Sequence, residues 1–407
     1  MASLITEPNF INNNAYKYEH ILKSQLTKYI DRTPTFTTYY HINNNDSTVD
    51  DGYQDIESLL GSRSPLRFEK IKDFPIYGVE PINMQLQDQD QGLDMNYESE
   101  AIILPNTIKP LPNDFFTIDV VNNSYVFRVT SVEVDTIRPD NFFKIQYKLE
   151  HISDQRNEIL NDKVINKFTC ILDNIGTENN CIIEDEIFDK LSEIELMYQG
   201  ICDLYISVFY NERYNTFILP TSVGIKIYDP LQIEFMNRHD LFNRPYRYKT
   251  LSISNEVNDD KLKLKYERSM YRYFEKIDNR LLTEFKYELY PAIYRKETCF
   301  ARWYDNSVYI TDLPNSPSSK SAREIFSPEF TKILLSNEKT DNFYVEFFRK
   351  YVHGEIESIY DIDDKLGDQV LFMEPNDEMF FMTPILLYVI KTITNSFLKA
   401  KGVKRGE

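Results

Sequence analysis

The chain has 407 residues, a length typical of two or three domains. Its 46 Lys and Arg against 64 Asp and Glu leave a formal net charge of −18, which argues against a general nucleic-acid-binding protein, because such proteins present clustered cations. Hydrophobic residues make up 42% and charged residues 27%, which argues against wholesale disorder. With 11 glycines in all, a Gly-rich loop that wraps a phosphate is not expected.

The first 67 residues are predicted to form an N-terminal arm and a helix. Residues 1–14 are polar and Asn-rich, and they lack the basic and apolar regions of a secretion signal. The spacing of apolar residues and the position of turn residues then predict, in order, a helix over 15–30, a strand over 33–40, a loop over 43–52 and a short helix over 53–60.

Residues 68–183 are predicted to form an antiparallel β-rich module. A short apolar strand at 101–104 is followed by three prolines, which keep the chain extended and non-helical. Alternation of apolar and polar residues then predicts four consecutive strands, at 115–121, 125–130, 132–137 and 142–149. A meander of this kind, with one apolar face, forms a small barrel or sandwich.

The remaining sequence is expected to be rich in helices, so the whole chain reads as an α+β protein with extended terminal arms. A helix-rich domain is expected over 184–312, with long helices at 184–210 and 265–290 and an irregular or β excursion at 213–235 that ends at Tyr228-Asp229-Pro230.

A C-terminal helical region with a basic tail is expected over 313–407. It opens with a Ser/Pro-rich loop at 313–319, and helices are predicted at 343–352 and 384–398. The apolar run at 385–390 is far shorter than the roughly 20 residues that a membrane span needs, so no membrane partner is expected.

Cysteine and histidine do not indicate a catalytic or metal site. The histidines are isolated and form no HxH or HExxH pattern: His20, His41, His151, His239 and His353. The cysteines lack CxxC spacing and lie among apolar or aromatic neighbours, so buried free thiols are expected at all four: Cys170, Cys181, Cys202 and Cys299.

One acidic segment has the spacing of a calcium loop. Asp88, Asp90 and Asp94 surround Gly92, and alternating carboxylates of this kind can converge on one cation. The glycine stands at the fifth position of the loop rather than the sixth, and Ser99 occupies the twelfth position, where an EF-hand has glutamate. We favour a solvated loop and keep a cation site as the alternative.

Two further acidic clusters and the basic tail allow ordinary structural explanations. Residues 184–186 begin a predicted helix, where negative charge stabilises the helix dipole, and residues 361–364 could supply paired carboxylates but come with no positioned partner. The basic tail could contact an acidic partner or DNA, although cations more often complement a helix C-terminus, and contact with nucleic acid is not favoured; its cations are Lys399, Lys401, Lys404 and Arg405.

The chain contains 29 Tyr and 27 Phe, and these numbers have two interpretations. An A/T-rich genome favours their codons. Tyrosine also suits protein interfaces, because it combines a large apolar ring with a polar tip.

Several segments together resemble virion structural proteins of tailed bacteriophages with A/T-rich genomes. They are IILPNTIKPLPNDFF at 102–116, YVFRVT at 125–130, DTI at 135–137, FTC at 168–170 and NIGTE at 174–178. The resemblance covers residues 65–215. It implies a small β module with helices and arms, of the kind found in the neck, the tail adaptors or the baseplate.

We therefore expect a non-enzymatic structural subunit of a tailed-phage particle, made in the host cytoplasm. No catalytic, cofactor-binding or metal-binding residue is assigned, and neither a cofactor nor a small-molecule substrate is expected. Its partners would be other virion proteins and copies of itself, bound through arms and Tyr-rich surfaces. Two alternatives stay open: a metal-dependent hydrolase that uses Asp88, Asp90 and Asp94, and a regulatory protein that binds host proteins.

Overall fold

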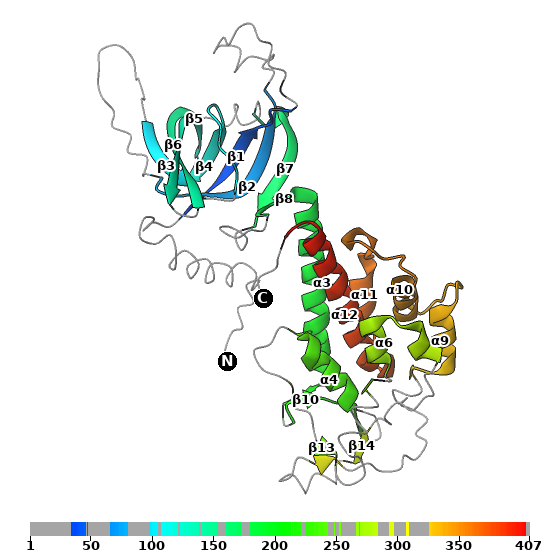
Figure 1. Cartoon of the computed structure of the whole chain (residues 1–407). Helices are drawn as coiled ribbons and strands as arrows, with labels where there is room; N and C mark the ends of the chain where they lie inside the picture. Colours follow the sequence, from blue (N-terminus) through cyan, green and yellow to red (C-terminus); the bar gives the residue numbers. More distant parts are fainter. Residues whose placement is uncertain are drawn as a thin grey trace, which may run out of the picture. The chain divides into compact units, whose positions relative to one another are not determined.

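A computed structural model divides the chain into two compact units (Figure 1). Unit 1 comprises Met1–Asp189 and Leu398–Glu407, and unit 2 comprises Lys190–Phe397. The structure describes residues 34–45, 47, 66–79, 98–104, 107–120, 123–137, 140–152, 160–171, 180–212, 214–220, 225–242, 248, 252–253, 266–267, 269–283, 293–296, 307–308 and 325–403. The α+β prediction, with a β module followed by a helix-rich half, is confirmed. The finer domain boundaries expected after residues 67, 183 and 312 stay predictions.

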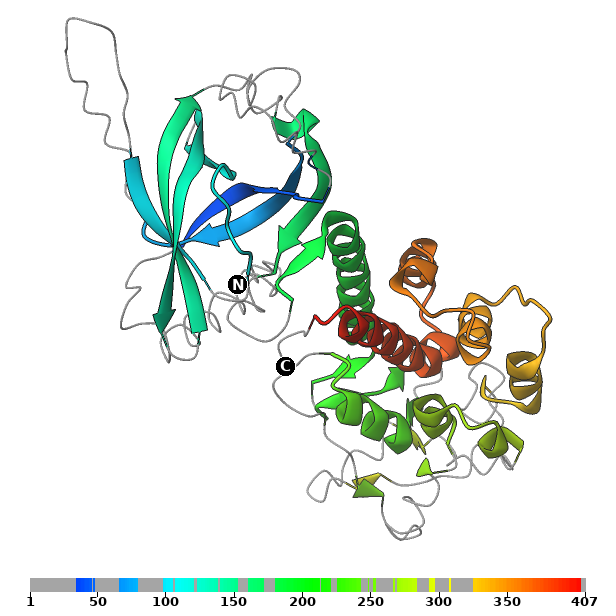
Figure 2. The same cartoon turned by 45° about the horizontal axis from the view of Figure 1, so that its top comes forward.

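Unit 1 contains a curled mixed sheet of eight strands (Figure 2). Its spatial order is β3-β6-β5-β4-β1-β2-β7-β8, and every neighbouring pair is antiparallel except β2 and β7. The strands are β1 (Thr35–Ile42), β2 (Phe68–Ile76), β3 (Glu98–Ile103), β4 (Phe115–Val120), β5 (Asn123–Ile137), β6 (Asp140–Ile152), β7 (Val164–Cys170) and β8 (Ile182–Glu184).

Strand β2 contacts three other strands, and this accounts for the curl of the sheet. Its residues 68–72 pair with β7 on one side while β1 runs along the other. Asp73 then adopts a left-handed backbone conformation with φ 54°, which bends the strand. Just beyond β2, Tyr77 exchanges two backbone hydrogen bonds with Ile102 of β3, at 2.8 and 2.9 Å. Because β3 lies at the far edge of the sheet, this bridge draws the sheet towards a barrel.

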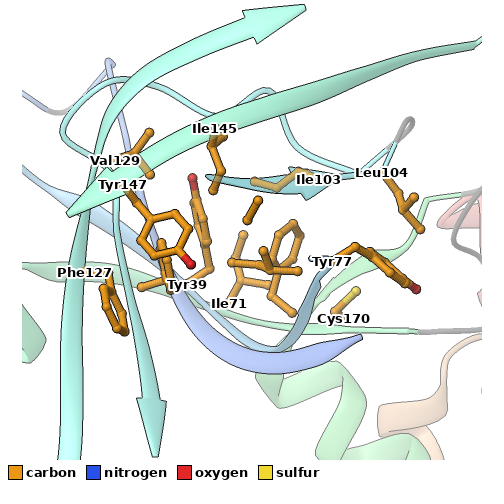
Figure 3. Packing of buried hydrophobic residues seen from close by; sticks show 14 of the residues in the cluster. Tyr39, Ile71, Tyr77, Ile103, Leu104, Phe127, Val129, Ile145, Tyr147 and Cys170 are labelled. Carbon is orange, nitrogen blue, oxygen red and sulfur yellow. The ribbon is translucent and has the colours of Figure 1, made fainter. Parts of the chain in front are cut away.

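The concave face of the sheet holds an aromatic core (Figure 3). The rings of Tyr39 and Phe116 stack with their centroids 6.3 Å apart, and Phe116 also stacks on Phe127 at 5.1 Å. Tyr147 packs edge-on against both phenylalanines. A smaller apolar cluster lies apart from this core and includes Tyr40, Phe68, Phe115, Val126 and Leu160.

The expected four-strand meander is a three-strand meander. The segments expected as strands at 125–130 and 132–137 belong to one long strand, β5, which pairs with β4 and β6. Nothing between Thr130 and Val132 supplies a turn. The register instead shifts between Val129 and Ser131, so one extra residue is absorbed as a bulge while the strand continues.

Unit 2 is built around two long helices, α3 (Asp185–Phe209) and α12 (Asp377–Ala400). The first residues of α3 belong to unit 1. The two helices lie side by side in both views (Figures 1 and 2). The shorter helices are α4 (Pro230–His239), α6 (Met270–Lys276), α7 (Asn279–Thr283), α9 (Pro328–Leu335), α10 (Phe343–Val352), the 3-10 turn η4 (Ile359–Asp361) and α11 (Lys365–Leu371). Short strands form three small sheets: β9 (Tyr210–Asn211) with β10 (Thr216–Phe217); β11 (Leu219–Pro220) with β12 (Ile225–Tyr228) and β14 (Ile293–Lys296); and β13 (Ser252–Ile253) with β15 (Ser307–Val308).

Helix α12 begins earlier than expected, and Pro384 lies inside it. A proline at this position cannot donate to the carbonyl of Phe380, four residues before it. That carbonyl accepts hydrogen bonds from the Tyr205 hydroxyl, at 2.8 Å, and from the Gln232 side-chain amide. Helices α3 and α4 thereby satisfy the backbone group that Pro384 leaves open, so the helix continues through the proline. With 24 residues, α12 has the length and composition to cross a membrane, and 67% of its most apolar window is buried within the protein.

Two other helices differ from expectation. The excursion expected at 213–235 contains short strands and then α4, which Asp229 caps by accepting from the backbone N–H groups of Leu231 and Gln232. The long helix expected at 265–290 is interrupted after α6, because Ile277 adopts a left-handed conformation with φ 45° and ends that helix.

The described part of the C-terminal tail ends helix α12 rather than forming an arm. Gly402, with φ 72°, donates to the carbonyl of Lys399, and the N–H of Val403 donates to Leu398. This pair of hydrogen bonds is a Schellman cap, which favours glycine at the left-handed position. The rest of the tail lies outside the described residues, as do the N-terminal arm and the helices expected at 15–30 and 53–60.

Candidate interaction surfaces

Five basic side chains stand on β2 and β7 of unit 1 or one residue before them. We call them the basic strip, and they are Arg67, Lys70, Lys72, Lys163 and Lys167. The register places Lys70 and Lys167 on one face of the sheet and Arg67 towards the other. Lys70 and Lys167 lie opposite each other in the parallel register, where two like charges repel. Burial, together with the charge of Arg67, lowers the pKa of Lys163 from its ordinary value. The strip therefore concentrates positive charge in a chain whose net charge is negative.

Some cations of the strip are already neutralised or occupied. Lys72 forms an ion pair with Asp185, with 2.6 Å between Nζ and Oδ2, and Lys70 donates to the side-chain oxygen of Asn161 at 2.9 Å. Arg67 and Lys167 are exposed and have no ion-pair partner within the described part of the chain. Asn161 is a neutral amide, so its hydrogen bond leaves the charge of Lys70 in place, and of the five cations the described contacts neutralise Lys72.

An apolar residue lies within the strip. The register between β2 and β7 shifts between Phe68 and Glu69, so Ile165 is left without a partner residue. Its side chain is 38% exposed, between Lys163 and Lys167 along the chain.

Unit 2 carries an exposed surface of the opposite charge, formed by α3, by α11 and by the residues after α11. We call it the acidic apolar patch; it consists of Leu196, Asp368, Leu371, Phe372 and Glu374. Phe372 is 84% exposed and Leu196 66% exposed, an unusual environment for side chains of this size. Asp368 and Glu374 are exposed and have no ion-pair partner among the residues that the structure describes.

Glycine allows α11 to pack closely on α3. A Cβ atom placed on Gly367 would come within 2.7 Å of Cγ of Met197, whereas one placed on Gly200 would meet the Leu371 side chain at an ordinary 3.8 Å. Leu196 lies one turn before Gly200 on α3, on the side that Leu371 covers. The exposed apolar side chains of the two helices therefore belong to one surface.

One group of polar side chains in unit 1 is buried and holds the fold together. Asp114 is fully buried and accepts four hydrogen bonds, from the Tyr39 hydroxyl, Nδ1 of His41, and the backbone N–H groups of Ile42 and Leu111. Burial lowers the pKa of His41, but the hydrogen bond and the charge of Asp114 outweigh it, so the net shift is upward. The network joins β1 to the turn before β4 and leaves Asp114 no position from which to reach a substrate.

Two buried carboxylates of unit 2 have opposite electrostatic environments. Burial raises the pKa of Asp229 to about 6, although the backbone groups that it caps favour its ionised form. Burial also disfavours ionised Glu275, but hydrogen bonds from His239, Tyr266 and Arg272 lower the pKa of its carboxyl to about 2. Both carboxylates are occupied by contacts within the fold.

The acidic clusters singled out from the sequence have local structural roles. Asp185 accepts from Lys72 and from the Thr169 hydroxyl at 2.5 Å, which ties the start of α3 to β2 and β7. These hydrogen bonds hold its pKa below the ordinary value although burial opposes them. In the other cluster, Asp361 takes part in a capping box, Asp363 accepts from the backbone N–H of Lys365, and Asp364 pairs with Lys190.

The candidate metal loop of Asp88, Asp90 and Asp94 lies outside the described residues. Within the described ones, no group of three or more His, Cys, Asp or Glu side chains could hold a metal ion. His239 contacts Glu275 at 2.8 Å, and His353 caps α10, while His20 and the side chain of His151 lie outside the description.

The expectation of buried free thiols is confirmed for three of the four cysteines: Cys170, Cys181 and Cys202. Cys299 lies outside the described residues.

Among the tyrosine side chains that the structure describes, most are core residues, in unit 1 as in unit 2. Side chains such as Tyr39, Tyr147, Tyr205 and Tyr271 are fully buried, and among the tyrosine side chains that the structure describes, Tyr360 alone is more than about a third exposed, at 53%. A Tyr-rich interaction surface is therefore not seen in this part of the chain. Sequence reasoning did not identify the basic strip or the acidic apolar patch, because each combines segments that only the fold brings together.

The β module is also the part of the chain that resembles a known family. Residues 11–184, fewer than half of the chain, match the family described as putative phage head-tail joining protein. The match ends at the last residue of β8, immediately before α3. No curated protein and no solved structure matches the chain. The family match supports a structural protein of a phage virion.

Proposed function

We propose that this protein is a non-enzymatic subunit of the head–tail joining region, or neck, of a tailed-phage particle. The observation that carries the proposal is the family match over residues 11–184, which spans the described β-strands of unit 1. The neck is favoured over the baseplate because the family description refers to the junction between head and tail. Its partners would be copies of itself and other virion proteins.

The arrangement of charged groups is consistent with a binding role. Asp114, Asp229 and Glu275 are held by hydrogen bonds within the fold. Some of the exposed charges lie on the basic strip and the acidic apolar patch, and the patch adds exposed apolar side chains. The N-terminal arm expected at residues 1–14 would add contacts with neighbouring subunits.

Quantitative mass spectrometry of purified phage particles tests this proposal. We expect the protein at a fixed copy number, about 6 or 12 per particle if it forms a closed ring. In a matched infection, an amber allele in its gene should leave filled heads and complete tails unjoined, and a suppressor host should restore joined particles. Absence of the protein from particles, or normal joining under the amber allele, would overturn the proposal.

A further inference from the structure

We infer that Cys170 and Cys181 form a redox site, in which a disulfide closes between the two thiols when the protein meets a small oxidised disulfide and fastens strand β8 to strand β7. It is a modification site, separate from the two candidate surfaces. The chemistry of the pair is independent of the proposed function, whereas the stage at which the bond forms in the life of a particle rests on that function.

Strand pairing brings the two cysteines together. Cys170 is the last residue of β7 and pairs with Ile182 of β8, so Cys181 lies next to its partner on the neighbouring segment. The backbone N–H of Ile171 donates to the carbonyl of Cys181 at 2.6 Å, which continues the contact beyond the strand pairs. For a diagonal pair of this kind, the spacing and rise of strands place the Cα atoms about 6 Å apart, within the range that a disulfide spans.

Both thiols belong to the same core. Regular alternation would direct Cys181 and Ile182 to opposite faces, but Cys181 precedes the first residue of β8, where the regular strand has not yet begun. Cys170 and Cys181 are 4% and 1% exposed, and both are members of the buried cluster on the concave face, in which Figure 3 shows Cys170. The thiol of Cys170 donates a hydrogen bond to the sulfur of Cys181, so the two sulfur atoms contact each other.

This hydrogen bond gives the two thiols different reactivities. It raises the pKa of Cys170, as do burial and the charge of Asp73, and it lowers the pKa of Cys181 although burial opposes it. The thiolate is the nucleophile in disulfide exchange. Cys181 is therefore the attacking residue, and Cys170 is the residue that closes the bond.

Exchange with oxidised glutathione needs no further reactant. The Cys181 thiolate attacks one sulfur of glutathione disulfide, the S–S bond of the oxidant breaks, and one glutathione leaves as its thiolate. Cys170 then gives up its proton and attacks the Cys181 sulfur of the mixed disulfide, which releases the second glutathione. The two cysteines together lose two electrons, and these reduce one glutathione disulfide to two glutathione thiols.

The position of β8 gives the oxidant access to the pair. This strand lies at the edge of the sheet and is joined to β7 by three residue pairs, so we expect it to open locally more often than the central strands. Opening exposes Cys181 to the oxidant, and closing returns it to Cys170. The new bond would close a loop over residues 171–180 and lower the opened fraction of β8 on the order of a hundredfold.

Oxidation of the purified full-length protein tests the pairing. The chain has four cysteines. After treatment with oxidised glutathione and alkylation under denaturing conditions, we expect two of them to be alkylated instead of all four, and peptide mapping should join Cys170 to Cys181. Hydrogen exchange of the β8 amides should slow on the order of a hundredfold in the oxidised protein, while that of α9 should stay unchanged.

Serine variants separate the roles of the two thiols. Cys170→Ser keeps a hydroxyl donor beside Cys181, which should then retain one glutathione as a mixed disulfide. Cys181→Ser removes the attacking thiol, so Cys170 should stay free, and neither variant should show slower exchange of β8. Cys202→Ser is the matched control, because Cys202 is also a buried free thiol but lies in unit 2, and this variant should form the same disulfide as wild type.

Four alkylated cysteines after oxidation of the wild-type protein, or a disulfide that includes Cys202 or Cys299, would overturn the inference. Particles keep this result distinct from the proposed function. Protein from the reducing cytoplasm of infected cells should hold both thiols free, and particles purified with an alkylating agent present should contain the disulfide. Free thiols in particles would refute this order of events, whereas absence of the protein from particles would refute the neck assignment.

Discussion

Replacing Asp229 with asparagine should stabilise unit 2 at neutral pH but not in acid. Asp229 is 2% exposed, and burial raises its pKa from 3.8 to about 6. Above pH 6 the native state therefore holds a buried charge that the unfolded chain would keep in water. A difference of about 2 pKa units corresponds to roughly 3 kcal/mol of unfolding free energy. This destabilisation is absent below about pH 4 and develops as the pH rises from about 4 to 6.

Asparagine keeps the side-chain oxygen that caps α4 and removes the charge. We therefore expect the difference in unfolding free energy between Asp229→Asn and wild type to grow by about 3 kcal/mol between pH 3.5 and pH 7. Other titrating groups are common to both proteins and cancel in this difference. Hydrogen exchange of α4 and α12 amides, followed by mass spectrometry across that pH range, reports the stability of this unit.

Asp240→Asn is the matched control, because Asp240 is an exposed carboxylate at the opposite end of the same helix. Its replacement, at an exposed position, should change stability little. A difference between Asp229→Asn and wild type that stays constant from pH 3.5 to 7 would refute the reasoning, since the buried charge would then cost nothing.

Three further outcomes are expected. Gly367→Ala should destabilise the packing of α11 on α3, because its Cβ would overlap Met197, whereas Gly200→Ala should be neutral or stabilising by up to about 1 kcal/mol; urea denaturation compares the two variants, and equal effects would contradict the packing argument. Asp114→Ala should destabilise unit 1 by about 3 kcal/mol or more, because it leaves several buried donors without an acceptor, and unchanged protection of β1 amides would disprove this. Since the pKa of His41 is raised, its pairing stabilises unit 1 below pH 6.5 and this contribution is lost as the pH rises through the folded-state pKa; His41→Gln should abolish that dependence in thermal unfolding, and an unchanged pH profile would count against it.

Local sequence patterns predicted many of the elements well. Alternation placed β4 and β6 close to their observed bounds, and the helix expected at 343–352 is α10 with the same ends. In these segments one side faces a core and the pattern extends over the whole element, so composition and structure agree.

The errors occurred where a distant partner decides the local structure. Pro384 is an ordinary helix start by its sequence, but Tyr205 and Gln232 satisfy the carbonyl that it leaves open and allow α12 to begin at Asp377. The interruption at Ile277 is equally unexpected, because a β-branched residue rarely takes a left-handed conformation. A short stretch of sequence around Pro384 does not contain Tyr205 or Gln232, so a local pattern cannot predict these hydrogen bonds.

The same limit applies to the candidate surfaces. Lys70 and Lys167 become neighbours only through a parallel pairing that joins segments about a hundred residues apart, and the exposure of Phe372 depends on how α11 ends. The sequence showed that the chain is acidic, but not that Lys70 and Lys167 lie side by side on one face of the sheet.

The hydrogen bonds at Phe380 have a consequence for the synthesis of the protein. They join Tyr205 and Gln232 to a carbonyl 175 and 148 residues later in the chain, so α3 and α4 cannot complete their polar contacts until α12 has left the ribosome. The N–H of Asn180 in unit 1 likewise donates to the carbonyl of Gly402. Both units thus use the last segment of the described chain, and a product that is terminated early would lack these contacts in each of them.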